Sequence, residues 1–145
     1  MIMTSLLPAL ERVLLTLWVG GLWVSGFIVA PLLFAGLESR AQAGTLAGSL
    51  FSIMSFIGLA CGTLLLGLRL LRREHPATRW PLLVIVVMLA LVLVGEFLLA
   101  PMIAELRAVG QVESSRFGQL HGLAAVLFIG NCVLGLVLVA FGQRD

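Results

Sequence analysis

Four long apolar runs constrain this chain more than any other feature. They cover about residues 13–37, 44–68, 80–104 and 117–141, and each reaches the roughly 20 residues that one helix needs to cross a bilayer. The 145 residues are 61% hydrophobic and only 11% charged, which excludes a soluble globular enzyme and a disordered chain. We therefore expect an all-α, integral membrane four-helix bundle that forms a single transmembrane domain over residues 1–145.

The distribution of arginine predicts the orientation of the four helices. All nine basic residues are Arg, and an even number of spans puts both termini and the middle loop on one side. Six of the nine fall on that side: Arg12, Arg69, Arg72, Arg73, Arg79 and Arg144. The positive-inside rule then predicts a bacterial inner-membrane protein with cytoplasmic termini. We expect no nucleic-acid partner, and we interpret Arg107, Arg116, Glu105 and Glu113 as solvated charges of the opposite loop.

Two pairs of matching segments indicate an internal repeat. Phe27-Ile28-Val29-Ala30-Pro31 returns 70 residues later as Phe97-Leu98-Leu99-Ala100-Pro101, and Phe56-Ile57-Gly58 returns 72 residues later as Phe128-Ile129-Gly130. This order predicts two parallel helical hairpins related by an axis along the membrane normal, with chance matching in an apolar alphabet as the alternative. Pro31 and Pro101 should kink their helices by freeing a carbonyl four residues back, or else they merely shape the entry to the loops.

Small residues recur at the spacing that lets membrane helices approach closely. Gly44, Gly48 and Ser52 follow one another at four-residue intervals, as do Gly58 with Gly62 and Gly118 with Gly122. The pattern favours close packing inside one bundle. An interface with a second copy or with another membrane subunit is the alternative. Cys61 and Cys132 fall inside apolar runs, so we interpret them as small packing residues.

Glu96 and His121 are the ionisable residues that lie clearly inside the apolar runs. An ionisable group in the bilayer is costly and normally faces the bundle interior or a wet cavity. Both residues lie in the outer half of the second hairpin, so contact between them, directly or through water, is plausible. The repeat aligns them with Gly26 and Ser49, so both ionisable groups belong to the second half alone. The pair is either a structural hydrogen bond or part of a site for a cation, a proton or a polar ligand.

Metal and haem sites have few candidate ligands in this sequence. His121, Met102 and Glu96 are the weak candidates for a metal, and His121 with Met102 or Met54 could ligate a haem. We therefore predict no cofactor, with haem or copper left as alternatives. The sequence contains no phosphate-binding loop, nucleophile elbow, CxxC or HExxH motif, so we assign no catalytic residue and favour a non-enzymatic protein.

Three segments carry a resemblance to a known family. They are the stretch 17–34, which begins Leu17-Trp18-Val19-Gly20-Gly21 and contains Pro31, the stretch 43–51, and Phe117-x-x-Leu120-His121-Gly122. Together they resemble the bacterial branch of the transmembrane protein 205-like family, which implies a short four-helix membrane protein of unknown function. More distantly, the first helix resembles the copper-resistance-D-like group, which includes a haem-associated oxidase family. That oxidase family has a His in its first helix, where this chain has none.

Three functional hypotheses follow from the residues. The first is a polar pocket that opens outward, built from Glu96, His121, Ser49 and Ser25, which serves passage or sensing of a small solute or cation. The second is a metal- or haem-linked redox component that uses His121. The third is a structural or assembly subunit of a membrane complex. The lipid bilayer is the expected partner in all three, and a homo-oligomer or a membrane-complex partner is a further expectation.

Overall fold

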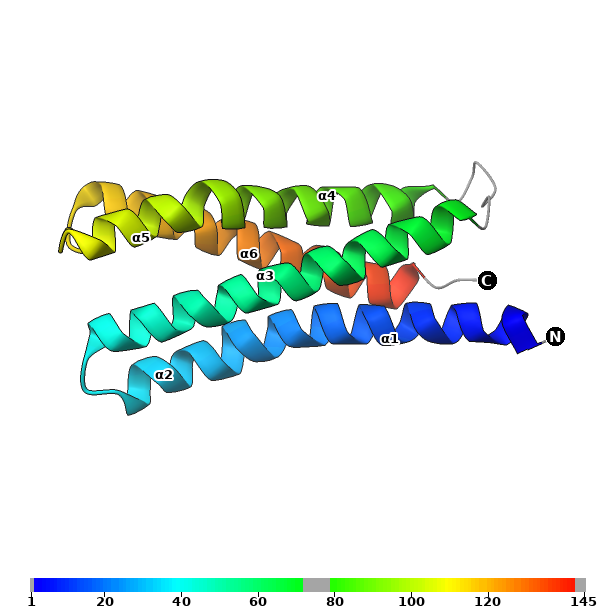
Figure 1. The fold of residues 1–145 in the computed structure, drawn as a ribbon, viewed down its shortest axis with the longest axis horizontal. Helices are drawn as coiled ribbons and strands as arrows, with labels where there is room; N and C mark the ends of the chain where they lie inside the picture. Colours follow the sequence, from blue (N-terminus) through cyan, green and yellow to red (C-terminus); the bar gives the residue numbers. More distant parts are fainter. Residues whose placement is uncertain (1, 72–78, 143–145) are drawn as a thin grey trace.

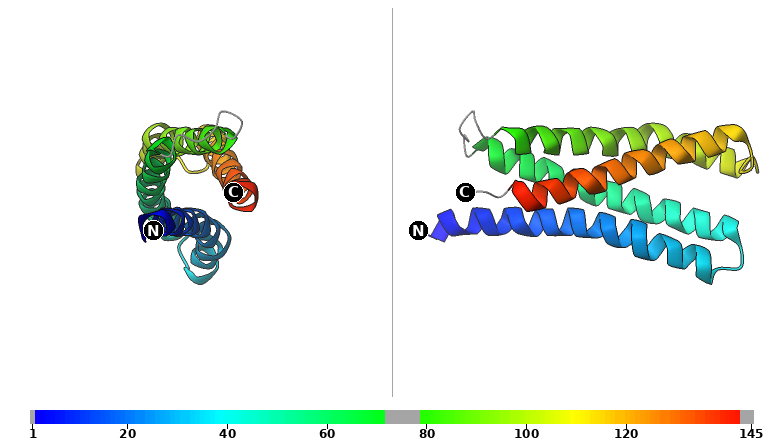
Figure 2. Two further views of the ribbon diagram at one scale, coloured as in Figure 1. Left: turned by 90° about the vertical axis from the view of Figure 1, so that its right-hand side faces the viewer. Right: turned by 180° about the vertical axis from the view of Figure 1, so that it is seen from behind.

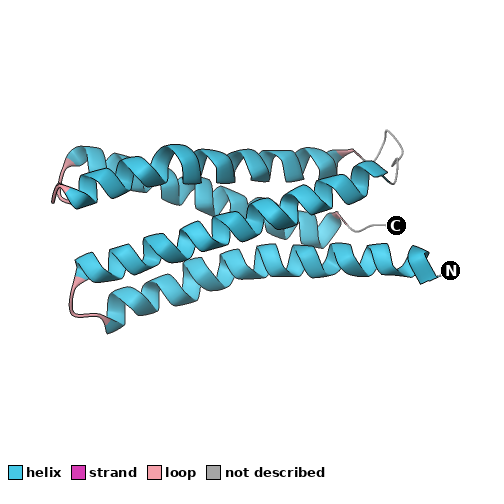
Figure 3. Ribbon diagram, viewed as in Figure 1, coloured by secondary structure: helices cyan, strands magenta, loops and turns pink. Residues whose placement is uncertain are grey.

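The computed structural model describes residues 2–71 and 79–142, with side chains from Leu6 onward, and this part of the chain is helical without any strand (Figure 3). The first span consists of α1 (Ile2–Val24), the π-helical segment η1 (Ser25–Val29) and α2 (Ala30–Gly36). The second span is α3 (Arg40–Leu71). The third consists of α4 (Trp80–Val94), the π-helical segment η3 (Gly95–Leu99) and α5 (Ala100–Ala108), and the fourth is α6 (Ser115–Phe141).

The four spans form two hairpins that point in the same direction (Figure 1). The chain enters each hairpin at the end that holds both termini, which we call the terminal end, and turns at the opposite end, which we call the loop end. Seen from the terminal end, α1, α3, α4 and α6 follow one another around the bundle (Figure 2). All four spans are long and apolar enough to cross a membrane. The expected four-helix bundle is confirmed, and the chain is a multi-pass membrane protein.

The helices are longer than the apolar runs that predicted them. They cover 2–36, 40–71, 80–108 and 115–141, because backbone hydrogen bonding continues past the hydrocarbon into the headgroup region, where hydropathy no longer marks a helix. Pro81 lies in the first turn of α4, where its fixed φ suits the start of a helix. Ser114 caps α6, since its hydroxyl oxygen accepts a hydrogen bond from the Phe117 amide at 3.2 Å.

A dense apolar core fills the half of the bundle near the terminal end. Its fully buried members come from all four spans: Leu15, Trp18, Leu65, Ile85, Met88, Cys132 and Leu138. Trp18 lies across Gly58 and Gly62, whose added Cβ atoms would collide with the indole ring. Cys61 and Cys132 are both free and buried, and both belong to this core. The interpretation of the cysteines as packing residues is therefore confirmed.

The glycines make room for large side chains more than they bring helix backbones together. Besides the Trp18 contact, Gly21 receives the Met54 side chain, and Gly26 receives the Phe128 ring. Gly118 and Gly122 have nothing within 4 Å of an added Cβ in the described residues. The expected close packing at Gly118 and Gly122 is therefore wrong for a single copy of the chain. At the loop end, the Gly44 and Gly48 face of α3 meets the Arg107 side chain of α5 instead.

The two hairpins separate toward the loop end. There α2 packs on α3, and α5 packs on α6, whereas no comparably extensive contact joins the two pairs among the described residues. Figures 1 and 2 show α3 crossing from α2 at the loop end to α4 at the terminal end. The bundle is therefore closed by four helices at one end and divided into two helix pairs at the other.

A π-helical segment precedes each of the two prolines, at the same repeat position. Segments η1 and η3 begin at Ser25 and Gly95, and in each the Ala before the proline donates its N–H five residues back, to Ser25 O or Gly95 O. The wider turn accommodates the proline ring, which would clash with a carbonyl in a regular α-helix. Pro31 and Pro101 thus mark the places where the spans leave regular α-helix, and there the hairpins begin to diverge (Figure 1).

A buried ion pair joins three helices at the terminal end. The Arg69 guanidinium lies 3.8 Å from the Glu11 carboxylate and donates a 3.0 Å hydrogen bond to the Gly142 carbonyl. Both side chains are buried, so Arg69, which the orientation prediction counted on the terminal side, lies inside the bundle. The pairing explains the burial, because a charge is tolerated inside when a counter-charge and a hydrogen bond accompany it. Arg72, Arg73 and Arg144, which the orientation prediction also used, lie outside the described residues.

Candidate functional site

Glu96 forms a hydrogen bond between the two hairpins, with α3 and not with α6. The Ser52 hydroxyl donates to Glu96 Oε1 at 2.7 Å. Glu96 lies about 18 Å from the end of α5 and Ser52 about 18 Å from the start of α3, so both belong to the same level of the bundle. A hydrogen bond to an ionised acceptor is roughly twice as strong as one between neutral groups. The contact therefore fixes the carboxylate on the face of η3 that looks toward the first hairpin.

The second carboxylate oxygen of Glu96 has capacity for another partner. No further hydrogen bond or ion pair reaches this side chain from the described residues, and the residue is partly exposed. A carboxylate offers about four lone-pair positions, of which Ser52 fills one. The site can therefore accept a cation or another hydrogen-bond donor without first breaking the contact with Ser52.

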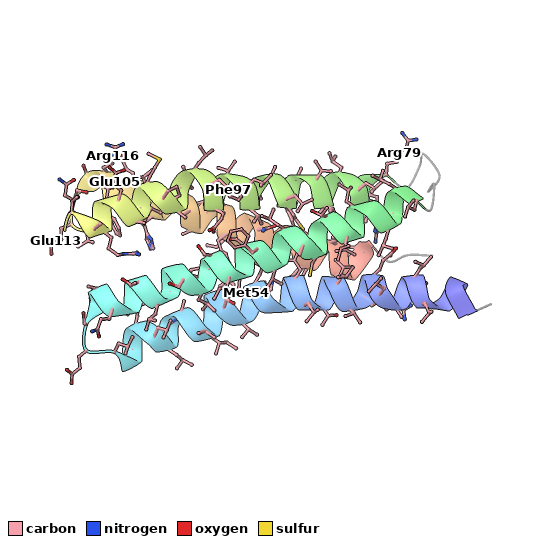
Figure 4. The ribbon with its side chains drawn as sticks, in the orientation of Figure 1. Met54, Arg79, Phe97, Glu105, Glu113 and Arg116 are labelled. Atoms are coloured by element: carbon pink, nitrogen blue, oxygen red, sulfur yellow. The ribbon has the colours of Figure 1, made fainter. Side chains whose placement is uncertain are left out.

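Two pairs of aromatic rings join the hairpins near the level of Glu96 and Ser52. Phe97 of η3 meets Phe56 of α3 edge to face at 6.3 Å, and Phe128 of α6 meets Phe51 of α3 at 5.1 Å. Phe97 is marked on η3 in Figure 4. Phe56 and Phe97 are both more than half exposed, so this pair of rings lies on the outside of the bundle.

Arg107 lies one to two helical turns closer to the loop end than Ser52. Its guanidinium faces Gly44 and Gly48 of α3, at 3.4 to 3.5 Å from where a Cβ would stand, and its Cζ lies 6.0 Å from the centre of the Phe117 ring. The interpretation of Arg107 as a solvated loop charge is therefore wrong. A helical side chain points toward the N-terminus of its helix, which directs Arg107 back between the hairpins and not into the loop.

The other predicted pocket residues do not gather around Glu96. His121 is exposed and stacks on Phe117 at 5.9 Å, with the two rings nearly parallel. Ser49 is exposed and donates to Thr45 O, whereas Ser25 is buried and donates to Gly21 O within its own span. The direct Glu96–His121 hydrogen bond is absent from the described residues. The prediction of this contact assumed a regular α-helix, whereas η3 adds a residue to the turn that carries Glu96.

The three candidate metal ligands have different neighbours. Met102 lines a shallow pocket at the loop end, while His121 stacks on Phe117 and Glu96 bonds to Ser52. Met54, the other possible haem ligand, packs on Gly21 of α1 and is labelled on that side of α3 in Figure 4. Within residues 2–71 and 79–142, no group of three or more His, Cys, Asp or Glu is placed to hold a metal ion.

The shallow pocket at the loop end is a separate feature. It has a volume of about 310 Å³ and is lined by Met102, Glu105, Leu106, Val109, Gln111 and Arg116. Figure 4 shows Glu105, Glu113 and Arg116 together at this end, with Arg79 at the other. This pocket lies beside the turn between α5 and α6, where Gly110 adopts a φ of 73°. The Glu96 side chain is not part of it.

Three residues of the bundle interior were missed by reasoning from the sequence. Ser52 was interpreted only as a small packing residue, and Arg107 only as a loop charge. Asn131 was not considered, because the search was limited to ionisable groups, yet it is buried and its Oδ1 has no hydrogen-bond partner among the described residues. A polar amide inside the fourth apolar run was the signal that could have identified Asn131.

Comparison with known proteins places most of the site within one family domain. Residues 13–112 match the family described as a domain of unknown function, DUF4149. The matched range includes Ser52, Glu96 and Arg107 and ends before His121. No curated protein matches the chain, and no solved structure does. The resemblance to the transmembrane protein 205-like family stays a prediction.

Proposed function

Because the chain belongs to the DUF4149 family, whose function is not known, we propose a function from its site: it binds a small cation or cationic solute between the two hairpins. The loop end faces the outside of the bacterial inner membrane in this proposal, since the terminal end holds the larger share of Arg. The ligand enters from the loop end and meets Glu96. The protein serves uptake or sensing of that solute and is not an enzyme.

One observation carries the proposal: a carboxylate deep in a membrane span whose partner, among the described residues, is a single hydroxyl. Glu96 accepts one hydrogen bond, from Ser52, while the buried carboxylate of Glu11 at the terminal end lies beside an arginine. An ionised carboxylate in the bilayer costs several kcal/mol unless it is compensated. A bound cation supplies the compensation that Ser52 alone does not.

The test compares Glu96→Gln with Glu105→Gln, a matched change of an exposed carboxylate at the loop end. Thermal unfolding of the protein in nanodiscs is followed with sodium, potassium, methylammonium or choline added in turn. A ligand that binds only the folded state stabilises it by about 2.7 kcal/mol at 100 times its Kd. We expect at least one cation to raise the Tm of the wild type and of Glu105→Gln, and to leave Glu96→Gln unchanged.

Two results would contradict this function. One is a Tm that responds to no cation in the wild type, and the other is an equal response in Glu96→Gln. The hydrogen bond itself favours a second candidate, a structural clasp between the hairpins in a subunit of a membrane complex. Gln retains an acceptor for Ser52, so a clasp predicts unchanged stability in Glu96→Gln and no cation effect in any variant.

A further inference from the structure

The guanidinium of Arg107 is a charged group whose five N–H donors have no acceptor among the described residues. No hydrogen bond or ion pair to Arg107 is formed within the described part of the chain. Glu105 is two positions earlier on α5, a spacing that does not share a helix face, and Glu96 is engaged by Ser52. The positive charge is therefore balanced by no acidic side chain of the described residues.

The planar face of the Arg107 guanidinium packs on its neighbours, whereas its N–H groups meet no acceptor among the described residues. An added Cβ at Gly44 would lie 3.5 Å from Nη2 and 3.7 Å from both Cζ and Nε. Such similar distances mean that the plane of the guanidinium rests over Gly44. The Phe117 ring contributes a cation–π contact at 6.0 Å from Cζ. Because Gly44 and Phe117 hold the plane of the guanidinium, its N–H groups are oriented before any ligand binds.

The Arg107 guanidinium lies at the depth of the phosphate groups of a bilayer. The spans contain 27 to 32 residues, hence about 40–48 Å of helix against about 30 Å of hydrocarbon. About 5–9 Å of each helix end thus lies among the headgroups. Gly44 and Gly48 are about 6 and 12 Å from the start of α3, so the guanidinium lies at the boundary between headgroups and hydrocarbon.

We propose that Arg107 binds a phosphate group at the mouth between the two hairpins. A planar guanidinium offers two parallel N–H bonds that match the oxygens of a phosphate. The phosphate comes from a lipid headgroup of the leaflet at the loop end or from a free phosphate in solution. This site is separate from Glu96, which recognises positive charge, and it does not depend on the cation proposed above.

The test measures binding of phosphatidylglycerol to the full-length protein in maltoside micelles, which contain no phosphate, by native mass spectrometry. The variants are Arg107→Gln and, as matched control, Arg116→Gln, an exposed arginine of the same end. We expect one lipid bound by the wild type and by Arg116→Gln. Binding to Arg107→Gln should be at least tenfold weaker.

A second variant leaves Arg107 in place and changes the surface of α3 on which its guanidinium packs. Gly44→Leu adds atoms where the guanidinium rests and favours the helix, because Leu is a better helix former than Gly. We expect the same tenfold loss in Gly44→Leu, which keeps the test valid if Arg107→Gln fails to fold.

Inorganic phosphate distinguishes the two sources. If it displaces the lipid from the wild type at concentrations near that of the lipid, the site recognises free phosphate; if it does not, the headgroup is the ligand. Both results support the phosphate site. Lipid and phosphate binding that are equal in the wild type, Arg107→Gln and Gly44→Leu would overturn it.

Discussion

The half of the bundle near the terminal end and the half near the loop end are built differently from the same kind of helix. Of the described residues, the terminal half contains all seven of the largest fully buried side chains, together with the Glu11–Arg69 ion pair. In the loop half the buried apolar residues include Ala30, Ala43, Ala47, Leu99 and Ile103, which pack α2 on α3 or α5 on α6. The terminal half therefore holds the bundle together, while the loop half is free to present polar groups.

The π-helical segments lie between these two halves and show how the difference arises. Segments η1 and η3 share the backbone distortion and the following Ala-Pro. At the second position of each, however, η1 has Gly26, covered by Phe128, and η3 has Glu96, bonded to Ser52. The contact between the hairpins at η1, the first crossing, is therefore filled by an aromatic ring, whereas the contact at η3, the second crossing, keeps an ionisable group.

The largest effect is expected in the terminal half. Trp18 is fully buried across Gly58 and Gly62, so Trp18→Ala should lower the free energy of unfolding by about 3–5 kcal/mol. Trp80, at the entrance of α4, is 37% exposed, and Trp80→Ala should cost less than about 1 kcal/mol. Unfolding in mixed micelles by titration with dodecyl sulfate measures both. Equal losses of unfolding free energy in the two variants would show that the core around Trp18 is no more tightly packed than the surroundings of Trp80.

An intermediate effect is expected at the π-helical segments. An added methyl at Gly26 would overlap the Phe128 ring, which is itself packed on Phe51. Gly26→Ala should therefore cost about 1–3 kcal/mol in unfolding free energy, as overpacking does. Gly95 has nothing within 4 Å of an added Cβ among the described residues, so Gly95→Ala should be neutral or stabilise by up to about 1 kcal/mol.

The same titration, applied to the two alanine variants of the π-helical segments, tells whether the first crossing is closed. A neutral Gly26→Ala would mean that the Phe128 ring moves aside at no cost. The first crossing would then be as open as the second, and the contrast between Gly26 and Glu96 would lose its structural meaning.

The sequence predicted the fold because hydropathy alone defines membrane spans. Apolar length placed the four helices, and the Ala-Pro matches located both distortions to within a few residues. The partner of Glu96 could not be predicted, because a π-turn changes the direction of its side chain and no sequence pattern distinguished Ser52 from other small residues of α3. Arg107 was missed for a similar reason: charge near a loop indicates solvent, whereas the fold directs this side chain inward over Gly44.

The smallest effect is expected at the contact between Ser52 and Glu96. Ser52→Ala removes the hydroxyl that donates to Glu96, and hydrogen bonds between membrane helices average about 0.6 kcal/mol in double-mutant cycles. Among the described residues Ser49 donates to Thr45 of its own helix, and it is exposed, so Ser49→Ala should change the unfolding free energy by less than about 0.5 kcal/mol. A double-mutant cycle of Ser52→Ala with Glu96→Ala measures the coupling between these two side chains. A value near 0.6 kcal/mol fits a loop half whose separation costs little, as a site that exchanges a ligand requires. A coupling above about 2 kcal/mol would exceed the largest measured for such bonds, and it would mean that the second crossing is a fixed joint like the terminal half.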